Sequence, residues 1–211
     1  MMQELTPALM LRAYAAGVFP MARSASSAEL FWVDPPDRGI LPVGGIHASR
    51  SLRRALRWGG WSASLNGDFN AVLDGCAARD ETWINAPLRR VYLQLRSMGH
   101  AHSLEVWQDG CLAGGVFGVA LGGAFFGESM FSARTNGSKL ALLWLSHQLG
   151  ACGFRLFDTQ FLTPHLASLG GREVPRAEYH SLLSEALSVP AVLSGPLPDA
   201  EALWQCTTQT S

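Results

Sequence analysis

Apolar residues recur every three to four positions in several segments of the chain, the spacing that places them on one face of a helix. The first such segment begins at Thr6-Pro7, a capping residue followed by a proline, and ends at Gly17. Capping residues, prolines and glycines delimit the other helices in the same way. The pattern predicts them over residues 50–57, 69–78, 87–98, 138–150, 164–169 and 176–187.

Strand patterns separate and follow these helices. Residues 31–33 and 39–43 flank a turn-rich segment and predict two short strands, and residues 102–107 alternate between apolar and polar. The apolar, glycine-rich run 114–126 predicts two strands joined by a hairpin turn at Gly122-Gly123. A last strand is expected over residues 154–160. Helices and strands together predict an α+β fold.

Two of these strands carry carboxylates in apolar surroundings. Glu128 follows the hairpin, at or near the end of its strand, and Asp158 and Gln160 end the 154–160 strand. Asp158 and Gln160 share one face because side chains alternate along a strand. If the two strands are neighbours, all three side chains converge on one cavity, as expected for a catalytic or binding site. The structural alternative is that Glu128 pairs with an arginine such as Arg134 and that Asp158 caps the following turn.

A basic helix follows the capping residue Ser49. Its four arginines are spaced i, i+3, i+4 and i+7, so they lie on one face. Such a stripe is either a solvated helix face or a contact surface for nucleic-acid phosphates. The four residues are Arg50, Arg53, Arg54 and Arg57.

Composition narrows the class of protein. The chain has 211 residues, of which 48% are hydrophobic and 16% charged, so it is globular rather than disordered. Its net charge of −1 argues against a protein that coats nucleic acid nonspecifically. The four cysteines are widely separated and are expected to be free, buried thiols. Met1–Glu4 lacks the features of a signal peptide, and no apolar run reaches the length of a membrane helix, so a cytoplasmic protein without membrane association is expected.

The change from helical to strand patterns suggests a domain boundary near residue 98. We expect a small N-terminal α/β domain over residues 1–98, which contains the basic helix. A second domain over residues 99–188 is expected to have a mixed sheet with flanking helices. Residues 189–211 contain three prolines and are expected to form a loosely attached tail.

The element order of the second half resembles the GNAT acyltransferase fold. Enzymes of that fold bind acetyl-CoA pyrophosphate through a glycine-containing turn that leads into the central helix. The corresponding turn here is Arg134–Lys139, in which lysine replaces the last small residue. A side chain at that place crowds the backbone cradle for phosphate, which argues against CoA.

Several strings, taken in order, closely resemble the leucyl/phenylalanyl-tRNA–protein transferase family. The resemblance covers residues 7–187 and implies an enzyme that moves Leu or Phe, and less well Met, from aminoacyl-tRNA to an N-terminal Arg or Lys of a protein. That addition marks the acceptor for N-end rule degradation. The resemblance implies no metal and no cofactor, and a monomer is expected. The strings are residues 14–21, 32–39, 82–84, 99–107, 127–132 and 158–160.

The residues fit this chemistry. An aminoacyl ester is already activated, so the enzyme mainly positions an amine and manages its proton. Asp158, with Gln160 beside it, is the candidate for orienting or deprotonating the attacking α-amine, either as a base or as electrostatic support. Glu128 is the candidate for holding the cationic acceptor residue.

The donor side chain requires an apolar pocket. Motif matching predicts its walls, although ordinary core packing explains each residue about as well. The arginine stripe is predicted to bind the tRNA acceptor arm through its phosphates. The predicted walls are Met21, Trp83, Val116, Phe125, Met130, Leu145 and Phe157.

The sequence departs from the common family pattern at three positions. Gly137 and Gly171 replace alanine, and Met21 stands where some members have tryptophan. These differences bear on donor preference more than on reaction type. Two other functions stay open: a noncatalytic module that binds basic N-termini, and a CoA-dependent N-acyltransferase.

Overall fold

A seven-stranded mixed sheet organises the computed structural model, which describes residues 5–24, 27, 29–78 and 82–209. Its strand order is β4-β5-β6-β7-β8-β3-β9, and a separate two-stranded sheet pairs β1 with β2. Neighbouring strands are antiparallel except for β7 and β8, which are parallel. The strands are β1 (Phe19–Ala22), β2 (Leu30–Val33), β3 (Asp37–Leu41), β4 (Trp61–Leu65), β5 (Ala101–Gln108), β6 (Cys111–Leu121), β7 (Ala124–Ser132), β8 (Leu156–Gln160) and β9 (Arg172–Pro175).

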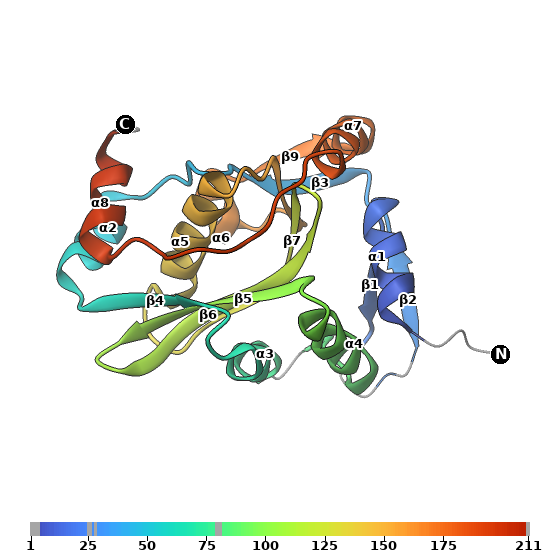
Figure 1. Cartoon of the computed structure of the whole chain (residues 1–211), viewed down its shortest axis with the longest axis horizontal. Coiled ribbons are helices and arrows are strands. Elements are labelled where there is room, and N and C mark those ends of the chain that lie inside the picture. The colour runs from blue at the N-terminus through green and yellow to red at the C-terminus, as the bar shows by residue number, and fades with distance from the viewer. Residues whose placement is uncertain (1–4, 25–26, 28, 79–81, 210–211) are drawn as a thin grey trace.

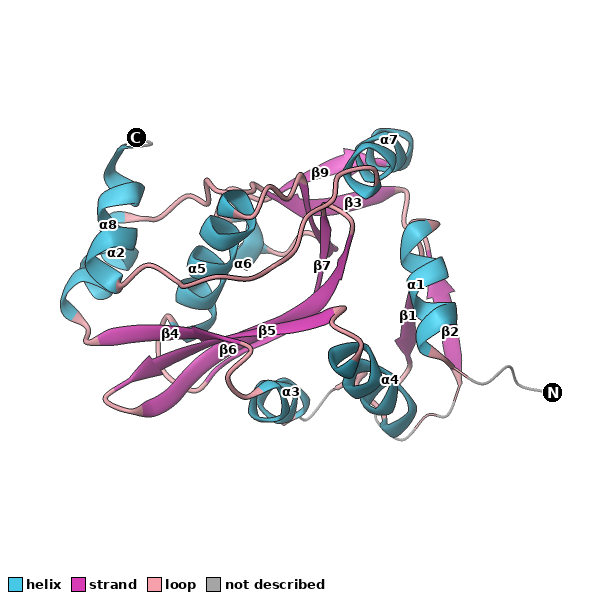
Figure 2. Ribbon diagram, viewed as in Figure 1, coloured by secondary structure: helices cyan, strands magenta, loops and turns pink. Residues whose placement is uncertain are grey.

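Helices cover both faces of the large sheet (Figure 1). Helices α3 and α4 lie on one face and α5 lies on the other, while α1 packs beside the small sheet at one end of the molecule. Figure 2 shows α2 and α8 together at the opposite end. The helices are α1 (Pro7–Ala15), α2 (Arg50–Trp58), α3 (Phe69–Ala77), α4 (Ala86–Ser97), α5 (Gly137–Ala151), α6 (Pro164–Ala167), α7 (Arg176–Leu187) and α8 (Ala200–Gln209).

Side-chain caps fix the helix starts that the sequence predicts. Thr6, Ser49 and Asp68 each accept a hydrogen bond from the backbone N–H three residues later, at 2.9–3.2 Å. The start of α5 differs, because Asn136 adopts a left-handed φ of 71° and provides no side-chain cap. Gly137 begins this helix against β6, where an added Cβ would lie 2.2 Å from the Ala113 carbonyl oxygen. Close packing therefore explains the glycine at position 137.

The central hairpin matches its prediction, because β6 ends at Leu121 and β7 begins at Ala124. Alternation along these strands divides the apolar side chains between two cores. Phe117 and Phe126 join the core under α1, α3, α4 and α7, whereas Val116 and Phe125 join the core under α2, α5 and α8. The α+β class and the mixed sheet with flanking helices are confirmed.

The large sheet crosses the boundary that was expected near residue 98. Strand β4 precedes this point in the chain and pairs with β5, which follows it. Strand β3 lies between β8 and β9 in the same sheet. Strands β3 and β4 therefore belong to the sheet of the second half, and only α1 and the two-stranded sheet of β1 and β2 lie beside it at one end (Figure 1).

The C-terminal segment is packed, in contrast to the loosely attached tail that its prolines suggested. Leu193 and Leu203 are buried in the α5 core. The indole N–H of Trp144 donates to the Pro198 carbonyl at 2.9 Å, and the Gln148 amide donates to the Ser194 carbonyl at 2.6 Å. Proline content did not reveal these long-range contacts. Strands β1, β4 and β9 and helix α8 were not predicted either.

The four cysteines are thiols that form no disulfide in the described part of the chain, but only Cys76 is buried, so the expectation of four buried thiols is wrong. No helix within the described ranges is both long and apolar enough to cross a membrane. The segment Met1–Glu4, on which the expectation about a signal peptide rested, lies outside the described residues.

Candidate active site

Strands β7 and β8 are neighbours, as the convergence of the three polar residues required. Their parallel pairing ends at Phe126 and Asp158. Beyond this point each strand contains one extra residue relative to its antiparallel partner, which is a β-bulge. Glu128 is the extra residue of β7, because Phe117 pairs with Ser129 and Gly118 with Gly127. Thr159 is the extra residue of β8, because Ile40 pairs with Asp158 and Gly39 with Gln160.

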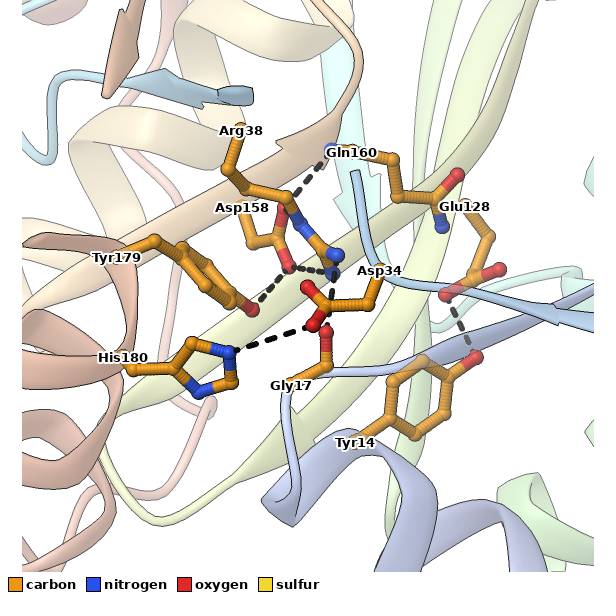
Figure 3. A network of polar contacts seen from close by, with 9 residues as sticks. All are labelled: Tyr14, Gly17, Asp34, Arg38, Glu128, Asp158, Gln160, Tyr179 and His180. Atoms are coloured by element: carbon orange, nitrogen blue, oxygen red, sulfur yellow. Dashed lines mark hydrogen bonds and ion pairs between the residues drawn. The ribbon is translucent and has the colours of Figure 1, made fainter. Parts of the chain in front are cut away.

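Asp158 is completely buried and its carboxylate accepts four hydrogen bonds (Figure 3). The Arg38 guanidinium donates to both oxygens, from Nε to Oδ1 at 2.9 Å and from Nη2 to Oδ2 at 2.7 Å. The Tyr179 hydroxyl donates to Oδ2 at 2.7 Å, and the Gln160 backbone N–H donates to Oδ1 at 2.8 Å. Asp158 therefore closes the turn after β8, as the structural alternative suggested, and is also half of a buried ion pair.

Arg38 is fixed on every side. Its guanidinium carbon lies 4.5 Å from the ring centroids of both Phe19 and Tyr179, and Nη1 donates to the Gly17 carbonyl at 3.0 Å. Burial opposes its charge, but the hydrogen bonds and the charge of Asp158 outweigh burial and raise the pKa of Arg38. Gly17 has φ +79°, and an added Cβ would lie 2.5 Å from the His180 ring, so this position requires glycine.

Glu128 is buried without an ion-pair partner among the described residues. The Tyr14 hydroxyl donates to Oε1 at 2.7 Å and the Tyr92 hydroxyl to Oε2 at 2.6 Å. Arg134 pairs with Asp109 instead, so the suggested pairing of Glu128 with Arg134 is wrong. Burial raises the pKa of Glu128 from its ordinary value of 4.5 to about 7, although the two tyrosine hydroxyls act in the opposite direction.

Gln160 connects the two carboxylates. Its backbone has a left-handed φ of 66°, a conformation that is uncommon for residues other than glycine. The bond from its N–H to Asp158 stabilises this turn, and its amide side chain extends toward Glu128, whose pKa it lowers (Figure 3). Strained backbone is often found at functional sites.

An apolar cavity of about 80 Å³ opens beside Glu128. This is several times the roughly 10–15 Å³ of such space that one water molecule needs. The Thr159 hydroxyl in its wall is buried and has no hydrogen-bond partner among the described residues. The site thus combines an apolar cavity, one carboxylate in its wall and a second carboxylate fixed behind it. The cavity is lined by Val116, Gly127, Glu128, Ser129, Met130, Leu142, Phe157, Thr159 and Leu166.

Comparison with known proteins matches two family models to the chain. The model described as leucyl/phenylalanyl-tRNA protein transferase matches residues 40–184, and that of the transferase's N-terminal domain matches residues 3–36. The chain belongs to the leucyl/phenylalanyl-tRNA–protein transferase family. The N-terminal model ends just before β3, where the chain enters the large sheet.

Relatives of the same name resemble this family member over nearly its whole length. The one from Paracoccus denitrificans is 59% identical over 208 residues, covering 98% of both chains. The one from Jannaschia sp. is 62% identical over 187 residues, which cover 89% of this chain and 88% of the relative. The one from Ruegeria pomeroyi is 54% identical over 209 residues, covering 99% and 100% of the two chains.

The residues predicted to form the donor pocket of this transferase family member fall into three groups. Val116, Met130 and Phe157 line the cavity. Phe125 and Leu145 lie in the core behind it, where the Phe125 and Phe157 ring centroids are 5.5 Å apart. The other two, Met21 and Trp83, pack against the opposite core. The Trp83 ring packs edge-on against the ring of Tyr92, with 6.4 Å between the centroids, and the Tyr92 hydroxyl bonds to Glu128.

The arginine stripe on α2 is divided by α8. Arg50, Arg54 and Arg57 are exposed and Arg53 is partly buried. Arg53 donates to the Thr207 carbonyl at 3.5 Å, and the Arg57 guanidinium lies 4.1 Å from the Trp204 ring centroid. The helix itself is confirmed, but half of its predicted contact face is shared with the C-terminal helix.

Four residues of the polar network were missed by reasoning from the sequence. Tyr14 and Arg38 lie within strings that carry the family resemblance, so that resemblance contained a signal for them. Tyr92 and Tyr179 occupy the apolar faces of α4 and α7, where periodicity does not distinguish them from ordinary core residues. Their hydroxyls point at carboxylates on other elements.

Proposed function

We propose that this chain transfers Leu or Phe, and less efficiently Met, from aminoacyl-tRNA to the N-terminal Arg or Lys of acceptor proteins, marking them for N-end rule degradation. The observation that carries the proposal is the apolar cavity with Glu128 in its wall and Asp158 and Gln160 beside it. Relatives more than half identical over almost the whole chain are named for this transfer. We infer a monomeric, cytoplasmic enzyme that needs no cofactor.

The cavity is suited to the donor side chain. Its walls are apolar apart from Glu128 and two hydroxyls, Ser129 and Thr159, so an unbranched or γ-branched apolar side chain gains free energy by entering it. A pocket of this kind discriminates by only about 1–3 kcal/mol per methylene group, so some use of Met is expected. We propose that Met21 and Trp83, which lie outside this cavity, contact another part of the aminoacyl-tRNA.

The polar residues are suited to the acceptor and the reacting groups. Glu128 offers a carboxylate to the positively charged N-terminal residue, as the sequence indicated. Asp158 has all its acceptor positions occupied by Arg38, Tyr179 and Gln160, which favours electrostatic support over direct deprotonation. In this role Asp158 holds the Gln160 turn, and the Gln160 amide orients the reactants.

We propose that α2 binds the tRNA acceptor arm through phosphates. Arg50, Arg54 and Arg57 are the exposed members of the stripe, and Arg53 and Arg57 contact α8. Reversal of Arg50 and Arg54 to Glu is expected to weaken aminoacyl-tRNA use and to reduce the slope of its salt dependence by about 0.9 per lost contact to a duplex. Reversal of the exposed residues Arg12 on α1 and Arg90 on α4 serves as the control. An unchanged salt dependence in the α2 variant would contradict the proposal.

Transfer of labelled phenylalanine from Phe-tRNA tests the function. The chain is expected to label a peptide that starts with Arg and not one that starts with Ala, without added CoA. Labelling of neither peptide by folded protein would leave a binding module for basic N-termini. Labelling that requires an acyl-CoA donor would indicate an N-acyltransferase. The glycine in the Arg134–Lys139 turn does not by itself support that alternative, because close packing against β6 accounts for Gly137.

A further inference from the structure

The two carboxylates of the site differ in their capacity to accept a proton. We propose that Glu128 is the group that takes the proton from the acceptor's α-ammonium, and that it is therefore a catalytic residue rather than only a binding one. This inference rests on the proposed function and changes the division of roles within it.

A carboxylate has about four acceptor positions, two on each oxygen. Asp158 uses all of them, because Arg38 donates twice and Tyr179 and the Gln160 N–H donate once each. Arg38 is itself fixed between two aromatic rings, so it cannot release Asp158 without rearrangement of the core. Asp158 also has no exposed surface and does not line the cavity. An amine has no route to its oxygens.

Glu128 has both free capacity and access. It receives one hydroxyl on each oxygen and interacts with the Gln160 amide, which leaves an acceptor position open. Its side chain lines the cavity and retains 7% exposure. The bulge at this residue accounts for the access, because it takes Glu128 out of the regular pairing with β6.

The surroundings also adjust its proton affinity. Tyr14 of α1, Tyr92 of α4, and Asp158 and Gln160 of β8 face this carboxylate, and Arg38 of β3 stabilises the Asp158 charge beside it. Burial is the largest influence and raises the pKa of Glu128 to about 7. A peptide α-amine has a pKa of about 7.7–8.0. Proton transfer between two groups of similar pKa is efficient, so this pair is well matched.

The reaction then balances as follows. The α-ammonium gives one proton to Glu128, and the freed nitrogen lone pair forms a C–N bond with the ester carbonyl carbon. The C–O bond to the ribose breaks as the tetrahedral intermediate collapses, and the second nitrogen proton passes to the leaving ribose oxygen. Glu128 releases its proton to solvent. The products are the extended peptide, deacylated tRNA and one proton.

The first test compares two tyrosine variants across pH. The acid limb of kcat/KM reports free-enzyme groups and is expected near pH 7 in the wild type. Tyr92→Phe removes a hydroxyl from Glu128 and is expected to move this limb upward by about one pH unit. Tyr179→Phe removes a hydroxyl from Asp158 and is expected to leave the limb in place. A limb that moves with Tyr179→Phe and not with Tyr92→Phe would assign the proton to Asp158 and overturn the proposal.

The second test uses an acceptor whose nucleophile needs no deprotonation. An Arg-terminated peptide with a hydrazine in place of the α-amine is largely neutral at pH 7. At pH 7, where about a tenth of the α-amine is neutral, Glu128→Gln is expected to lower single-turnover transfer to the normal peptide by about tenfold. The loss with the hydrazine acceptor should be less than about twofold.

A raised KM with unchanged kcat, or equal losses with both acceptors, would mean that Glu128 only binds the acceptor. Wild-type transfer to the normal peptide is measured in parallel. Its absence would refute the proposed function itself rather than this assignment.

Discussion

Asp158 and Glu128 lie at neighbouring strands of one sheet and are both buried, yet their surroundings differ in kind. Asp158 is surrounded by four donors that include an arginine, which occupy its oxygens and fix the turn at Gln160. Glu128 is held by neutral tyrosine hydroxyls beside a cavity, which leaves it able to gain or lose a proton near pH 7. The comparison shows how two identical functional groups acquire different roles from the partners supplied by distant elements.

The largest effect on stability is expected from removing the Asp158 charge beside Arg38. Asp158→Asn leaves the Arg38 charge buried without a counterion and is expected to lower the free energy of unfolding by about 3–5 kcal/mol. Asp109→Asn is the matched control, because Asp109 also pairs with an arginine but is 75% exposed. Its loss is expected to stay within about 1 kcal/mol. Similar urea midpoints for both variants would contradict the role given to Asp158.

The second effect concerns Glu128 and pH. Between pH 4.5 and about 7 the native state holds a proton on Glu128 that the unfolded state has lost, so stability falls as pH rises through this range. The rise in the pKa of Glu128 from 4.5 to about 7 corresponds to about 3 kcal/mol in the free energy of unfolding. His102 acts oppositely: burial lowers its pKa to about 4, so its contribution is lost as pH falls below 6.5.

The difference in unfolding free energy between the wild type and a Glu128 variant separates the contribution of Glu128 from that of His102, because His102 is present in both proteins. Glu128→Gln is expected to be more stable than the wild type at pH 8 and to match it near pH 4.5. Thermal unfolding of both proteins across this range provides the measurement. A parallel pH dependence in the two proteins would show that Glu128 is not protonated in the native state near neutrality.

Removing a tyrosine hydroxyl is expected to have a smaller effect on stability, which should depend on pH at Glu128 but not at Asp158. Tyr179→Phe removes a hydrogen bond to the carboxylate of the buried Arg38–Asp158 ion pair and is expected to cost about 2 kcal/mol at both pH 5.5 and pH 8. Tyr14→Phe removes the equivalent bond to Glu128 and is expected to cost more at pH 8, where Glu128 is ionised. Equal costs for Tyr14→Phe at the two pH values would argue against a titrating Glu128.

The smallest effect lies in the cavity wall. The Thr159 hydroxyl is buried without a partner, so Thr159→Val replaces an unsatisfied polar group by a methyl group of similar size. We expect about 1 kcal/mol of added stability and a lower KM for Leu-tRNA. Ser129→Ala, also in the cavity wall, is the comparison for removal of a hydroxyl. A loss of stability in Thr159→Val would show that this hydroxyl has a partner when the protein is in water.

Sequence patterns predicted the regular parts of this fold. Caps at Thr6, Ser49 and Asp68 and the turn at Gly122-Gly123 act within a few residues, so local chemistry determines them. The adjacency of the Glu128 and Asp158 strands was only a condition for their convergence, which the parallel pairing of β7 and β8 meets. Short strands such as β4 and β9 did not, because their pairing depends on distant partners.

The details of the site could not be predicted in the same way. A bulge arises from a one-residue mismatch between two paired strands, so the sequence of one strand alone does not predict it. The partners of the carboxylates are equally remote, since Tyr14 lies 114 positions from Glu128 and Arg38 lies 120 from Asp158. The sequence indicated which carboxylates matter, but only the folded structure distinguishes the one that is fixed from the one that titrates.

The most informative measurement is single-turnover transfer of phenylalanine from Phe-tRNA to an Arg-terminated peptide by Glu128→Gln at pH 7, where about one tenth of the peptide α-amine is neutral. We predict a rate about tenfold below that of the wild type, in a variant that is at least as stable as the wild type under the same conditions. A wild-type rate in folded Glu128→Gln would contradict this assignment and would return the chemical role to Asp158.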